Sequence, residues 1–290
     1  MKYIYYPGCS LEGTAREYSA STEAAMKALG AELFELEDWT CCGASAAEAT
    51  GYLLSLVLAA RNLALAEKMD VNADIMIPCS ACYLNLRRVE EHVREDKLLK
   101  GKINEALQEE GLEYEGGIKV RHFLDVIATD FDQKTIAPLV KKSLINMRVA
   151  PYYGCQALRP FGTYDDPERP QCMEPLIEAL GAEVHPWSVG AKCCGAALMT
   201  TKKDVAMELT GAILKAAKGA DCIVTVCPMC QMNLEAYQDA ISRALGEELE
   251  ITILYLPQLI GLAFGLSEEE LKLNLNLAVT DDFRDKLTKA

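Results

Sequence analysis

The chain lacks the features that a membrane-spanning or secreted protein needs. Its most apolar stretch, Tyr52–Ala60, is too short to cross a bilayer, and Arg61 and Asn62 follow it at once. The chain opens on the strand-like segment KYIYY, without the pattern of a secretory signal. We therefore expect no membrane span and a cytoplasmic location, where cysteines remain reduced.

The chain is also poor in positive charge. Its 29 Lys and Arg residues stand against 43 Asp and Glu residues, which gives a net charge of −14. Such a balance argues against nucleic acid as a partner, because binding to phosphate backbones depends on clustered cations. A small anionic ligand is still compatible with this charge, since it needs only a local cationic pocket.

Several cofactor signatures are missing as well. The sequence has no convincing flavin or nicotinamide fingerprint, and it lacks the tight run of four cysteines that holds a cubane ferredoxin cluster. Its three histidines, His92, His122 and His185, show no metal-ligand spacing. Any electrons that this protein handles must therefore come from a partner.

Cysteine, in contrast, is abundant and ordered. Ten of the twelve cysteines form two copies of one five-cysteine pattern, in which a single cysteine is followed by a Cys-Cys-Gly and then by a CxxC. The offsets between matching positions are 146, 152, 152, 148 and 148 residues. The first copy comprises Cys9, Cys41, Cys42, Cys79 and Cys82, and the second comprises Cys155, Cys193, Cys194, Cys227 and Cys230.

Other repeated features show that the two copies are an internal duplication. Both CxxC pairs are followed by an Asn-Leu pair, in CYLNL and CQMNL, and the peptide ALGAE recurs at 28–32 and 179–183. Half of the 290 residues are apolar, which suits two domains with cores of their own. We expect one domain over residues 1–145 and the second over residues 146–290, including a C-terminal tail.

Each half alternates short apolar runs with amphipathic segments, which predicts an α/β fold with a parallel sheet. In the first half the expected strands are Lys2–Tyr6, Glu32–Leu36 and Asp74–Ile77, and the expected helices are Ala15–Leu29, Ala46–Met69 and Tyr83–Val93. In the second half the strands are Arg148–Tyr152, Glu183–His185 and Cys222–Val226, and the helices are Glu174–Leu180, Val205–Lys218 and one opening at the second CxxC. The fold class is thus two pseudo-symmetric Rossmann-like α/β domains.

Every repeated cysteine follows a predicted strand directly or after one loop. In open parallel sheets, ligands collect at the carboxyl ends of the strands, so five thiolates from three loops can converge in each half. Neighbouring glycines, such as Gly8 and Gly154, allow sharp turns and a close approach of the backbone to an inorganic group. Both CxxC pairs open helices, whose free N–H groups can stabilise thiolate charge.

Outside the repeat, the sequence allows fewer predictions. Residues Lys97–Gly117 are expected to form a surface helix and connector, and Arg121–Val140 to bridge the domains. The tail after Leu266 could cap the fold or contact a further protein chain. Cys172 and Cys222 have no counterparts; Cys222 lies in an apolar strand and is expected to be a core thiol, and Cys172 an incidental thiol in a Pro-rich loop.

The chemistry of the cysteines leaves several alternatives. A disulfide framework does not suit adjacent and CxxC cysteines in a chain without a secretory signal. Zinc needs four ligands, usually two CxxC pairs, whereas each copy offers five cysteines, two of them adjacent. A thiol redox motif would explain only one CxxC at a time. The spacing favours an iron–sulfur centre of an unusual kind.

The motifs PGCS, TCCGAS and PCSAC, then YGCQ, KCCGAA and CPMCQMNL, resemble the paired CCG domains of the B subunit of heterodisulfide reductase. The segment RPFGTYDDPERP at 159–170 resembles that B subunit in particular, and the likeness covers nearly the whole chain. The resemblance implies that each five-cysteine set holds a noncubane 4Fe–4S cluster. It also implies an enzyme that reduces the disulfide of coenzyme M and coenzyme B between the two clusters, one electron through each, in methanogenesis.

The resemblance further implies partner subunits. These are a ferredoxin-like iron–sulfur subunit of the C type and a flavin-containing subunit of the A type, with a hydrogenase or formate dehydrogenase as a further candidate. Both coenzymes are anionic, and Arg159, Arg169 and Lys192 are the predicted anchors for them. The alternatives are an iron–sulfur electron-transfer subunit of another dehydrogenase or quinone-linked complex and a non-catalytic metal-bound scaffold.

Overall fold

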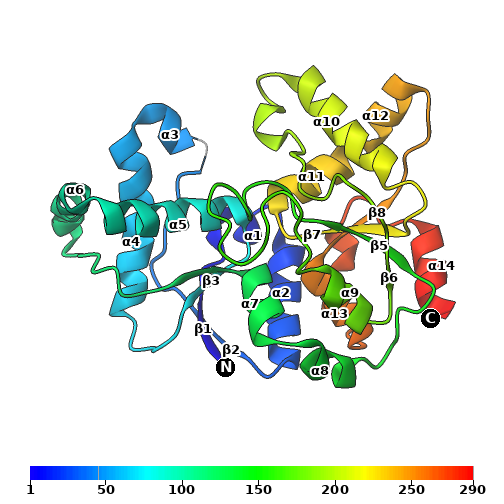
Figure 1. Ribbon diagram of the computed structural model, residues 1–290, viewed down its shortest axis with the longest axis horizontal. Helices are drawn as coiled ribbons and strands as arrows, with labels where there is room; N and C mark the ends of the chain where they lie inside the picture. Colours follow the sequence, from blue (N-terminus) through cyan, green and yellow to red (C-terminus); the bar gives the residue numbers. More distant parts are fainter. Residues whose placement is uncertain (45, 290) are drawn as a thin grey trace.

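In the part of the chain that the structure describes, eight short strands build two separate sheets, one in each half (Figure 1). The computed structural model describes residues 1–44 and 46–289. The first sheet has the order β2-β1-β3-β4 and the second the order β6-β5-β7-β8, with all neighbours parallel. The strands are β1 Lys2–Tyr5, β2 Glu32–Glu35, β3 Ile75–Ile77, β4 Val120–His122, β5 Arg148–Tyr152, β6 Glu183–Val184, β7 Cys222–Thr225 and β8 Thr252–Tyr255. The identical strand order confirms the predicted pseudo-symmetric α/β fold.

Helices follow the strands and cover both sheets. In the first half they are α1 Gly8–Glu12, α2 Arg16–Ala28, α3 Ala46–Thr50, α4 Tyr52–Lys68, α5 Ser80–Glu95, α6 Lys97–Leu107, α7 Phe123–Asp130 and α8 Gln133–Ile136. In the second half they are α9 Glu174–Ala179, α10 Lys203–Ala216, α11 Pro228–Ala236, α12 Gln238–Leu245, α13 Leu256–Ala263 and α14 Asp281–Lys289. The central strands β3 and β7 are buried on both faces, so β3 is apolar throughout and β7 is apolar except for the buried Thr225.

The two halves share a large hydrophobic core, and the second half has a smaller apolar cluster of its own. Buried residues of β1 and α2 belong to the same apolar cluster as those of α13 and α14. Helices α2 and α13 pack against each other between the sheets, and the Tyr18 ring stacks on the Tyr255 ring at a centroid distance of 4.0 Å (Figure 1). This shared core sets the position of one sheet relative to the other.

Two predictions about the helices need correction. The expected single helix Ala46–Met69 is broken at Gly51, whose extended backbone (φ −179°, ψ 135°) separates α3 from α4. Glycine favours such a break because it loses more conformational entropy in a helix than other residues do. The segment Arg121–Val140 is more than a bridge, since it completes β4 and supplies α7 and α8, of which α8 packs on α9.

The fourth strand of each sheet, β4 and β8, was not predicted from the sequence, nor were α12 and α13. The tail after Leu266 caps the second sheet. The backbone N–H of Ile253 in β8 donates to the Ala278 carbonyl at 3.0 Å, and Phe283 of α14 is buried.

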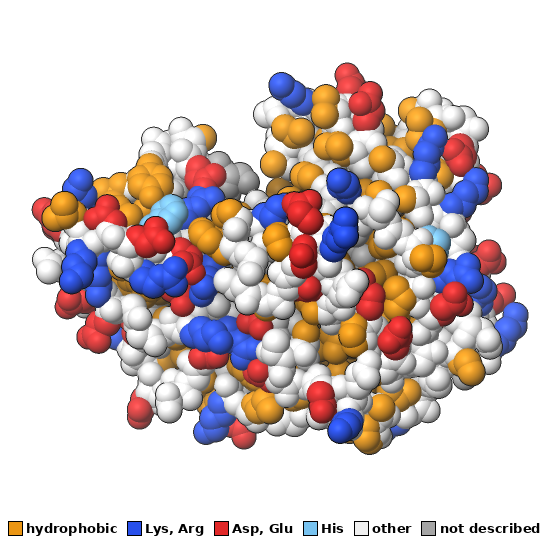
Figure 2. All heavy atoms as spheres, viewed as in Figure 1, with side chains coloured by type: hydrophobic (Ala, Val, Ile, Leu, Met, Phe, Trp, Pro, Cys, Tyr) orange, Lys and Arg blue, Asp and Glu red, His pale blue; other side chains and the backbone are white. Residues whose placement is uncertain are grey.

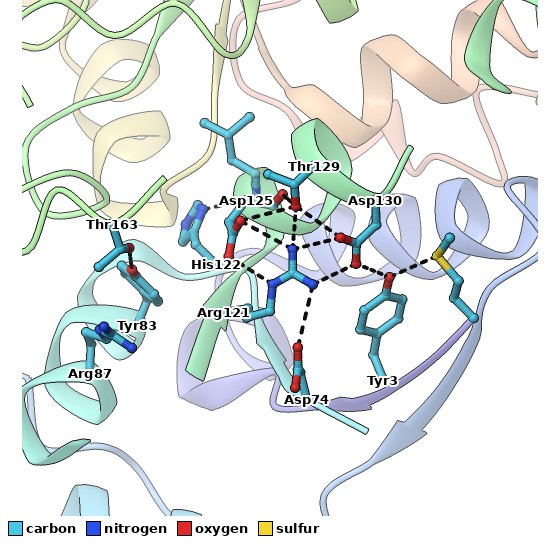
Figure 3. Close-up of polar contacts among 12 residues, drawn as sticks. Tyr3, Asp74, Tyr83, Arg87, Arg121, His122, Asp125, Thr129, Asp130 and Thr163 are labelled. Carbon is cyan, nitrogen blue, oxygen red and sulfur yellow. Dashed lines mark hydrogen bonds and ion pairs between the residues drawn. The ribbon is translucent and has the colours of Figure 1, made fainter. Parts of the chain in front are cut away.

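A partly buried ion-pair network around the buried Arg121 fixes the corner between β4 and α7 (Figure 3). The Arg121 guanidinium donates to Asp125 at 2.9 Å and to Asp130 at 2.6 Å, and Asp130 also accepts a hydrogen bond from the Tyr3 hydroxyl at 2.6 Å. Because every charged group in this network has partners, its burial is compensated. The network ties β1, β4 and α7 together and thereby sets the position of the next residue, His122.

The helices α3 and α4 of the first half and α10 and α12 of the second project from the same side of the molecule (Figure 1). The space-filling view shows a notch between these two projections (Figure 2).

Candidate metal centres

In the first half, three strand ends deliver the five repeated cysteines to one place. Cys9 lies in α1 directly after β1, Cys41 and Cys42 lie in the loop after β2, and Cys79 and Cys82 lie at the start of α5 after β3. The sulfur atoms of Cys9 and Cys41 are 3.6 Å apart, and those of Cys42 and Cys82 are 3.4 Å apart. The predicted convergence at the carboxyl ends of the strands is therefore observed.

The second half repeats this arrangement. Cys155 follows β5, Cys193 and Cys194 follow β6, and Cys227 and Cys230 lie at the start of α11 after β7. The sulfur atoms of Cys194 and Cys230 are 3.5 Å apart. All five cysteines line one cavity of about 60 Å³, together with residues that include Ser80 of the first half. The second-half cysteines thus surround a common space.

The two sites are supported by the same backbone contacts. The Tyr6 hydroxyl donates to the carbonyl of Thr40, the residue before Cys41, at 2.7 Å. The Tyr152 hydroxyl donates to the carbonyl of Lys192, the residue before Cys193, also at 2.7 Å. These contacts hold the loop that carries the adjacent cysteines.

The asparagine of the repeated Asn-Leu pair provides a second matched contact. Asn85 Nδ2 donates to the Cys42 carbonyl at 3.1 Å, and Asn233 Nδ2 donates to the Cys194 carbonyl at the same distance. The repeated Asn-Leu pair is thus the sequence signal for these supporting residues, although the sequence alone did not show what they do.

Glycine is required at the turn after the first strand of each half. Gly8 and Gly154 have φ values of 71° and 69°, in the left-handed region that glycine favours. A Cβ atom on Gly8 would lie 2.9 Å from the Cys82 sulfur, and one on Gly154 would lie 3.0 Å from the Cys230 sulfur. The backbone can therefore lie this close to the sulfur atoms only because glycine has no side chain.

The thiols share protons in pairs. A hydrogen bond from Cys155 lowers the pKa of Cys193 to about 6, with help from the Gly195 N–H and the positive charge of Arg159. The same pairing raises the pKa of Cys155 well above its usual range. In the first half, hydrogen bonds from Cys41 and then Cys82 lower the pKa of Cys42. Each site therefore contains a cysteine whose pKa is lowered by a neighbouring thiol, and a metal cation would take the place of the shared protons.

The donor set is suited to a sulfur-ligated metal group. Each site offers five sulfur atoms, with backbone N–H groups at the start of α5 and α11 to offset negative charge. Across residues 1–44 and 46–289, no three His, Cys, Asp or Glu side chains close around the position of a single metal ion. The sulfur atoms are instead brought together in close pairs around a larger space.

The predicted anchors for an anionic substrate are in different surroundings. Arg159 donates through its two terminal nitrogens to the carbonyls of Pro167 at 2.7 Å and Ala191 at 2.6 Å, so it ties the 159–170 loop to the segment before Cys193. Lys192 is exposed and adjacent to Cys193, and Arg169 is exposed on the loop. The structure thus brings Arg159 and Lys192 next to the cysteine pair, whereas Arg169 lies on the exposed surface of the loop.

The remaining cysteines and histidines lie outside the two sites. Cys222 is fully buried in β7, which confirms the predicted core thiol. Cys172 is half-buried, and its backbone N–H donates to Asp165. His185 Nε2 lies 3.0 Å from the Ala216 carbonyl, which is a structural contact. His122, in contrast, contacts the Ser80 hydroxyl, and Ser80 lines the cavity of the second-half site. The sequence predicted a role at the site for neither residue.

A family model for the cysteine-rich CCG domain matches residues 3–87 and again residues 149–235. The chain belongs to the CCG cysteine-rich domain family. Each match contains one complete five-cysteine set, so this family member carries two copies of the domain with all ten cysteines.

Curated relatives of this CCG protein cover almost its whole length. The 8-methylmenaquinol:fumarate reductase membrane anchor subunit of Wolinella succinogenes is 38% identical, over 95% of this chain and 96% of the relative. A protein of Archaeoglobus profundus that is described as like the B subunit of heterodisulfide reductase is 30% identical, over 93% of each. The B subunit of the ferredoxin:CoB-CoM heterodisulfide reductase of Methanosarcina mazei is 28% identical, over 99% of this chain and 97% of the relative.

These relatives confirm the suspected family of heterodisulfide reductase B subunits. They support an iron–sulfur subunit of an oxidoreductase complex. A crystal structure of a hypothetical protein from Helicobacter pylori matches with a TM-score of 0.78 at 15% identity, over 96% of this chain and 52% of that one. This CCG protein therefore spans about half the length of that chain, and the likeness bears on the fold alone.

None of the helices in the described part of the chain combines the length and apolar character needed to span a bilayer.

Proposed function

We propose that this CCG protein is an iron–sulfur electron-transfer subunit of a quinone-linked oxidoreductase complex. The observation that carries the proposal is the contact between two complete five-cysteine sites. The Ser80 hydroxyl, one residue after Cys79, donates to the carbonyl of Val226, one residue before Cys227, at 3.1 Å. The two CxxC segments therefore meet across the interface between the halves, as centres that exchange electrons would.

In this proposal each cysteine set holds one noncubane 4Fe–4S cluster, which would supply one-electron chemistry when bound. The residues that would hold the two clusters are Cys9, Cys41, Cys42, Cys79 and Cys82, and Cys155, Cys193, Cys194, Cys227 and Cys230. The protein supplies the thiolates, the N–H groups at the starts of α5 and α11 and the apolar surroundings. Twelve free cysteines suit the reducing conditions of the cytoplasm.

The quinone link rests on the relative from Wolinella succinogenes. At 38% identity it is more similar to this chain than the heterodisulfide reductase subunits, at 28% and 30%. Its name places it in a complex that connects 8-methylmenaquinol with fumarate. By analogy, this chain would pass electrons between a quinone and other subunits.

Reduction of the coenzyme M–coenzyme B disulfide, in methanogenesis, is the second candidate. The intact ten cysteines and the full-length similarity to heterodisulfide reductase B subunits favour it. Two electrons and two protons convert one disulfide into two thiols, which matches two one-electron centres. Arg159, Arg169 and Lys192 are the proposed substrate anchors, and the C-type and A-type subunits, with a hydrogenase or formate dehydrogenase, the proposed partners.

The first test is the metal content of the anaerobically purified protein. We expect about eight irons and eight acid-labile sulfides per chain, as two 4Fe–4S clusters require. Zinc without labile sulfide would contradict both candidates and leave a metal-stabilised scaffold.

The second test separates the two candidates. The complex with its native partners is reduced with dithionite and then mixed with a menaquinone analogue or with the heterodisulfide, while the iron–sulfur absorbance is followed. Reoxidation by the quinone alone supports the electron-transfer role. Reoxidation by the heterodisulfide, with formation of free thiols, supports the reductase instead.

A further inference from the structure

An open apolar groove of about 440 Å³ runs between α10 and α12 in the second half. An added Cβ atom on Gly211 would lie 3.1 Å from Ile241, so the lack of a side chain at Gly211 lets α12 pack close to α10. The apolar and small residues that line the groove recur three or four positions apart, on one face of each helix. They are Met207, Gly211 and Ala212 of α10 and Ile241, Ala244 and Leu245 of α12.

The corresponding region of the first half carries an additional helix. The offsets of 152 and 148 residues between matching cysteines make α4 the counterpart of α10, and α5 the counterpart of α11 and α12. Helix α6 follows α5 and packs against both α4 and α5 (Figure 1). Its apolar residues Ile103 and Leu107, one turn apart, are buried in the core. The first half thus completes its pair of helices with a third, amphipathic one.

The second half has no such helix in the part of the chain that the structure describes. Helix α12 ends at Leu245, and the next element is β8, which begins at Thr252. Matching residues differ in exposure accordingly. Ala60 of α4 is fully buried, whereas Ala212, at the matching position of α10, is exposed. The groove between α10 and α12 is therefore open where the first half has a covering helix.

The charged residues of the groove specify what a covering helix must carry. Glu208 lies at the position of the buried Leu56, and Asp204 lies one turn before it on the same face. Neither carboxylate forms an ion pair with a residue that the structure describes, whereas Lys215 at the other end is paired with Glu247 at 3.3 Å. Carboxylates that a partner covers need a cation to compensate for the lost water. The covering helix must therefore bring Lys or Arg to the end at Asp204.

This need for positive charge separates the possible occupants of the groove. A second copy of this chain has a net charge of −14, and the surface of a membrane is anionic too, so both repel the two carboxylates. A small molecule fits poorly, because the polar groups stand at the ends of the groove and none converges on its centre to orient a ligand. A groove between two helices suits the apolar face of an amphipathic helix.

The opposite face of α10 supports the second-half cysteine site. The Thr210 hydroxyl donates to the Cys194 carbonyl at 2.9 Å, and an added Cβ atom on Gly195 would lie 2.9 Å from the Ala206 Cα atom. A helix has a diameter of about 10–12 Å with its side chains. A chain that occupies the groove is thus separated from the second-half site by a single helix.

We propose that the groove between α10 and α12 is the docking surface for an amphipathic helix of a partner subunit. This helix carries apolar residues three or four positions apart and Lys or Arg at the end that meets Asp204 and Glu208. The inference rests on the proposed role of this chain as a subunit of an oxidoreductase complex. It adds the surface and the chemistry of one contact, and it places that partner subunit next to the second-half site.

The first test is a photocrosslink in the complex with its native partners. The photoreactive residue p-benzoylphenylalanine replaces Ala212 in the groove or, as the control, Ala106, an exposed alanine of α6. We expect position 212 to crosslink to one peptide of a partner subunit, with the apolar spacing and the Lys or Arg described above, and position 106 to leave that peptide unmodified. A crosslink from position 212 only to a second copy of this chain, only to lipid, or to nothing would overturn the inference.

The second test measures the affinity of that partner subunit for the iron-loaded protein. Ala212→Trp fills the groove, and Glu208→Lys repels the cation of the docked helix. We expect each variant to bind the partner at least about tenfold more weakly, with wild-type iron content, because both side chains are exposed on the face of α10 away from the cysteines. Exchange of the Lys or Arg in the crosslinked peptide for Glu should restore binding to Glu208→Lys. The controls Ala106→Trp and Glu105→Lys, at exposed positions of α6, should bind as the wild type does.

The outcomes separate this inference from the proposed function. Wild-type affinity in both Ala212→Trp and Glu208→Lys would overturn the docking surface, and the iron–sulfur function would stand if the protein holds its iron. Wild-type protein without iron would overturn the proposed function, whereas the expected crosslink at position 212 would still support the docking surface.

Discussion

The two halves of the molecule share one strand order and one arrangement of cysteines but differ in the side chains where they meet. Tyr6 and Tyr152 make the same hydrogen bond, at the same distance, to the loop that carries the adjacent cysteines. At the interface, in contrast, Ser80 corresponds to Pro228 and His122 to Tyr255. The duplication has therefore preserved the construction of each site and varied the contact between the sites.

The largest expected effect comes from removing one of the paired cysteines in either half. Cys42→Ser and Cys194→Ser should each lose about half of the iron, because a site without one thiolate cannot complete its ligand set. The measurement is iron and acid-labile sulfide per chain. Cys222→Ala is the control, since Cys222 is buried in β7 outside both sites. Loss of all iron from either variant would contradict two independent sites.

Alanine at the matched glycines tests how closely the backbone approaches the sulfur atoms. Gly8→Ala and Gly154→Ala should each cost about 1–3 kcal/mol from the positive φ, with further loss of iron from contact with the Cys82 or Cys230 sulfur. Stability by denaturant titration and iron content are the two measurements.

Gly30 and Gly219 are matched controls for this prediction. They have φ values of 75° and 94°, but an added Cβ at either meets no other atom within 4 Å. Alanine there should reduce stability alone. Equal loss of iron from the control variants would show that strain, and not contact with sulfur, is responsible.

The exposed cysteines Cys41 and Cys193 occupy matching positions and should differ in reactivity in metal-free protein. The pKa of Cys193 is lowered to about 6, first by the hydrogen bond from Cys155, whereas the hydrogen bond with Cys42 raises the pKa of Cys41 well above its usual range. At pH 7 Cys193 is therefore mostly thiolate and Cys41 a thiol.

We expect iodoacetamide to modify Cys193 at least about tenfold faster than Cys41 at pH 7, measured by peptide mass spectrometry. The Cys193 rate should fall as the pH is lowered through 6, because its thiolate is protonated there, and level off above 7. Equal rates for the two cysteines would contradict the difference between the halves.

The smallest effect is expected from the asparagines of the repeat. Asn85→Ala leaves the Cys42 carbonyl without a side-chain donor, which costs about 1–2 kcal/mol for a buried group. Asn233→Ala removes one of the two side-chain donors to the Cys194 carbonyl. Asn233→Ala should be the milder change, because the Cys194 carbonyl also accepts from the Thr210 hydroxyl at 2.9 Å. Urea denaturation compares the free energies of unfolding of the two variants. A larger loss of stability in Asn233→Ala than in Asn85→Ala would contradict this prediction.

Much of the fold could be predicted because the chain repeats itself. Three strands of each sheet, the helix starts at both CxxC pairs and the core position of Cys222 all followed from periodicity and turn residues. The break at Gly51 and the strands β4 and β8 could not be predicted, because short strands next to apolar helices have no distinct period.

The sequence by itself determined the duplication, the two five-cysteine sets and the order of elements that brings each set to one sheet edge. Only the tertiary structure decided how the two sets face each other. The contact between Ser80 and Val226 joins residues 146 positions apart, and α2 packs on α13 in the core that the two halves share. Repeats and periods are local properties of a chain, whereas the contact between two sites depends on how their shared core packs, and no local pattern encodes that.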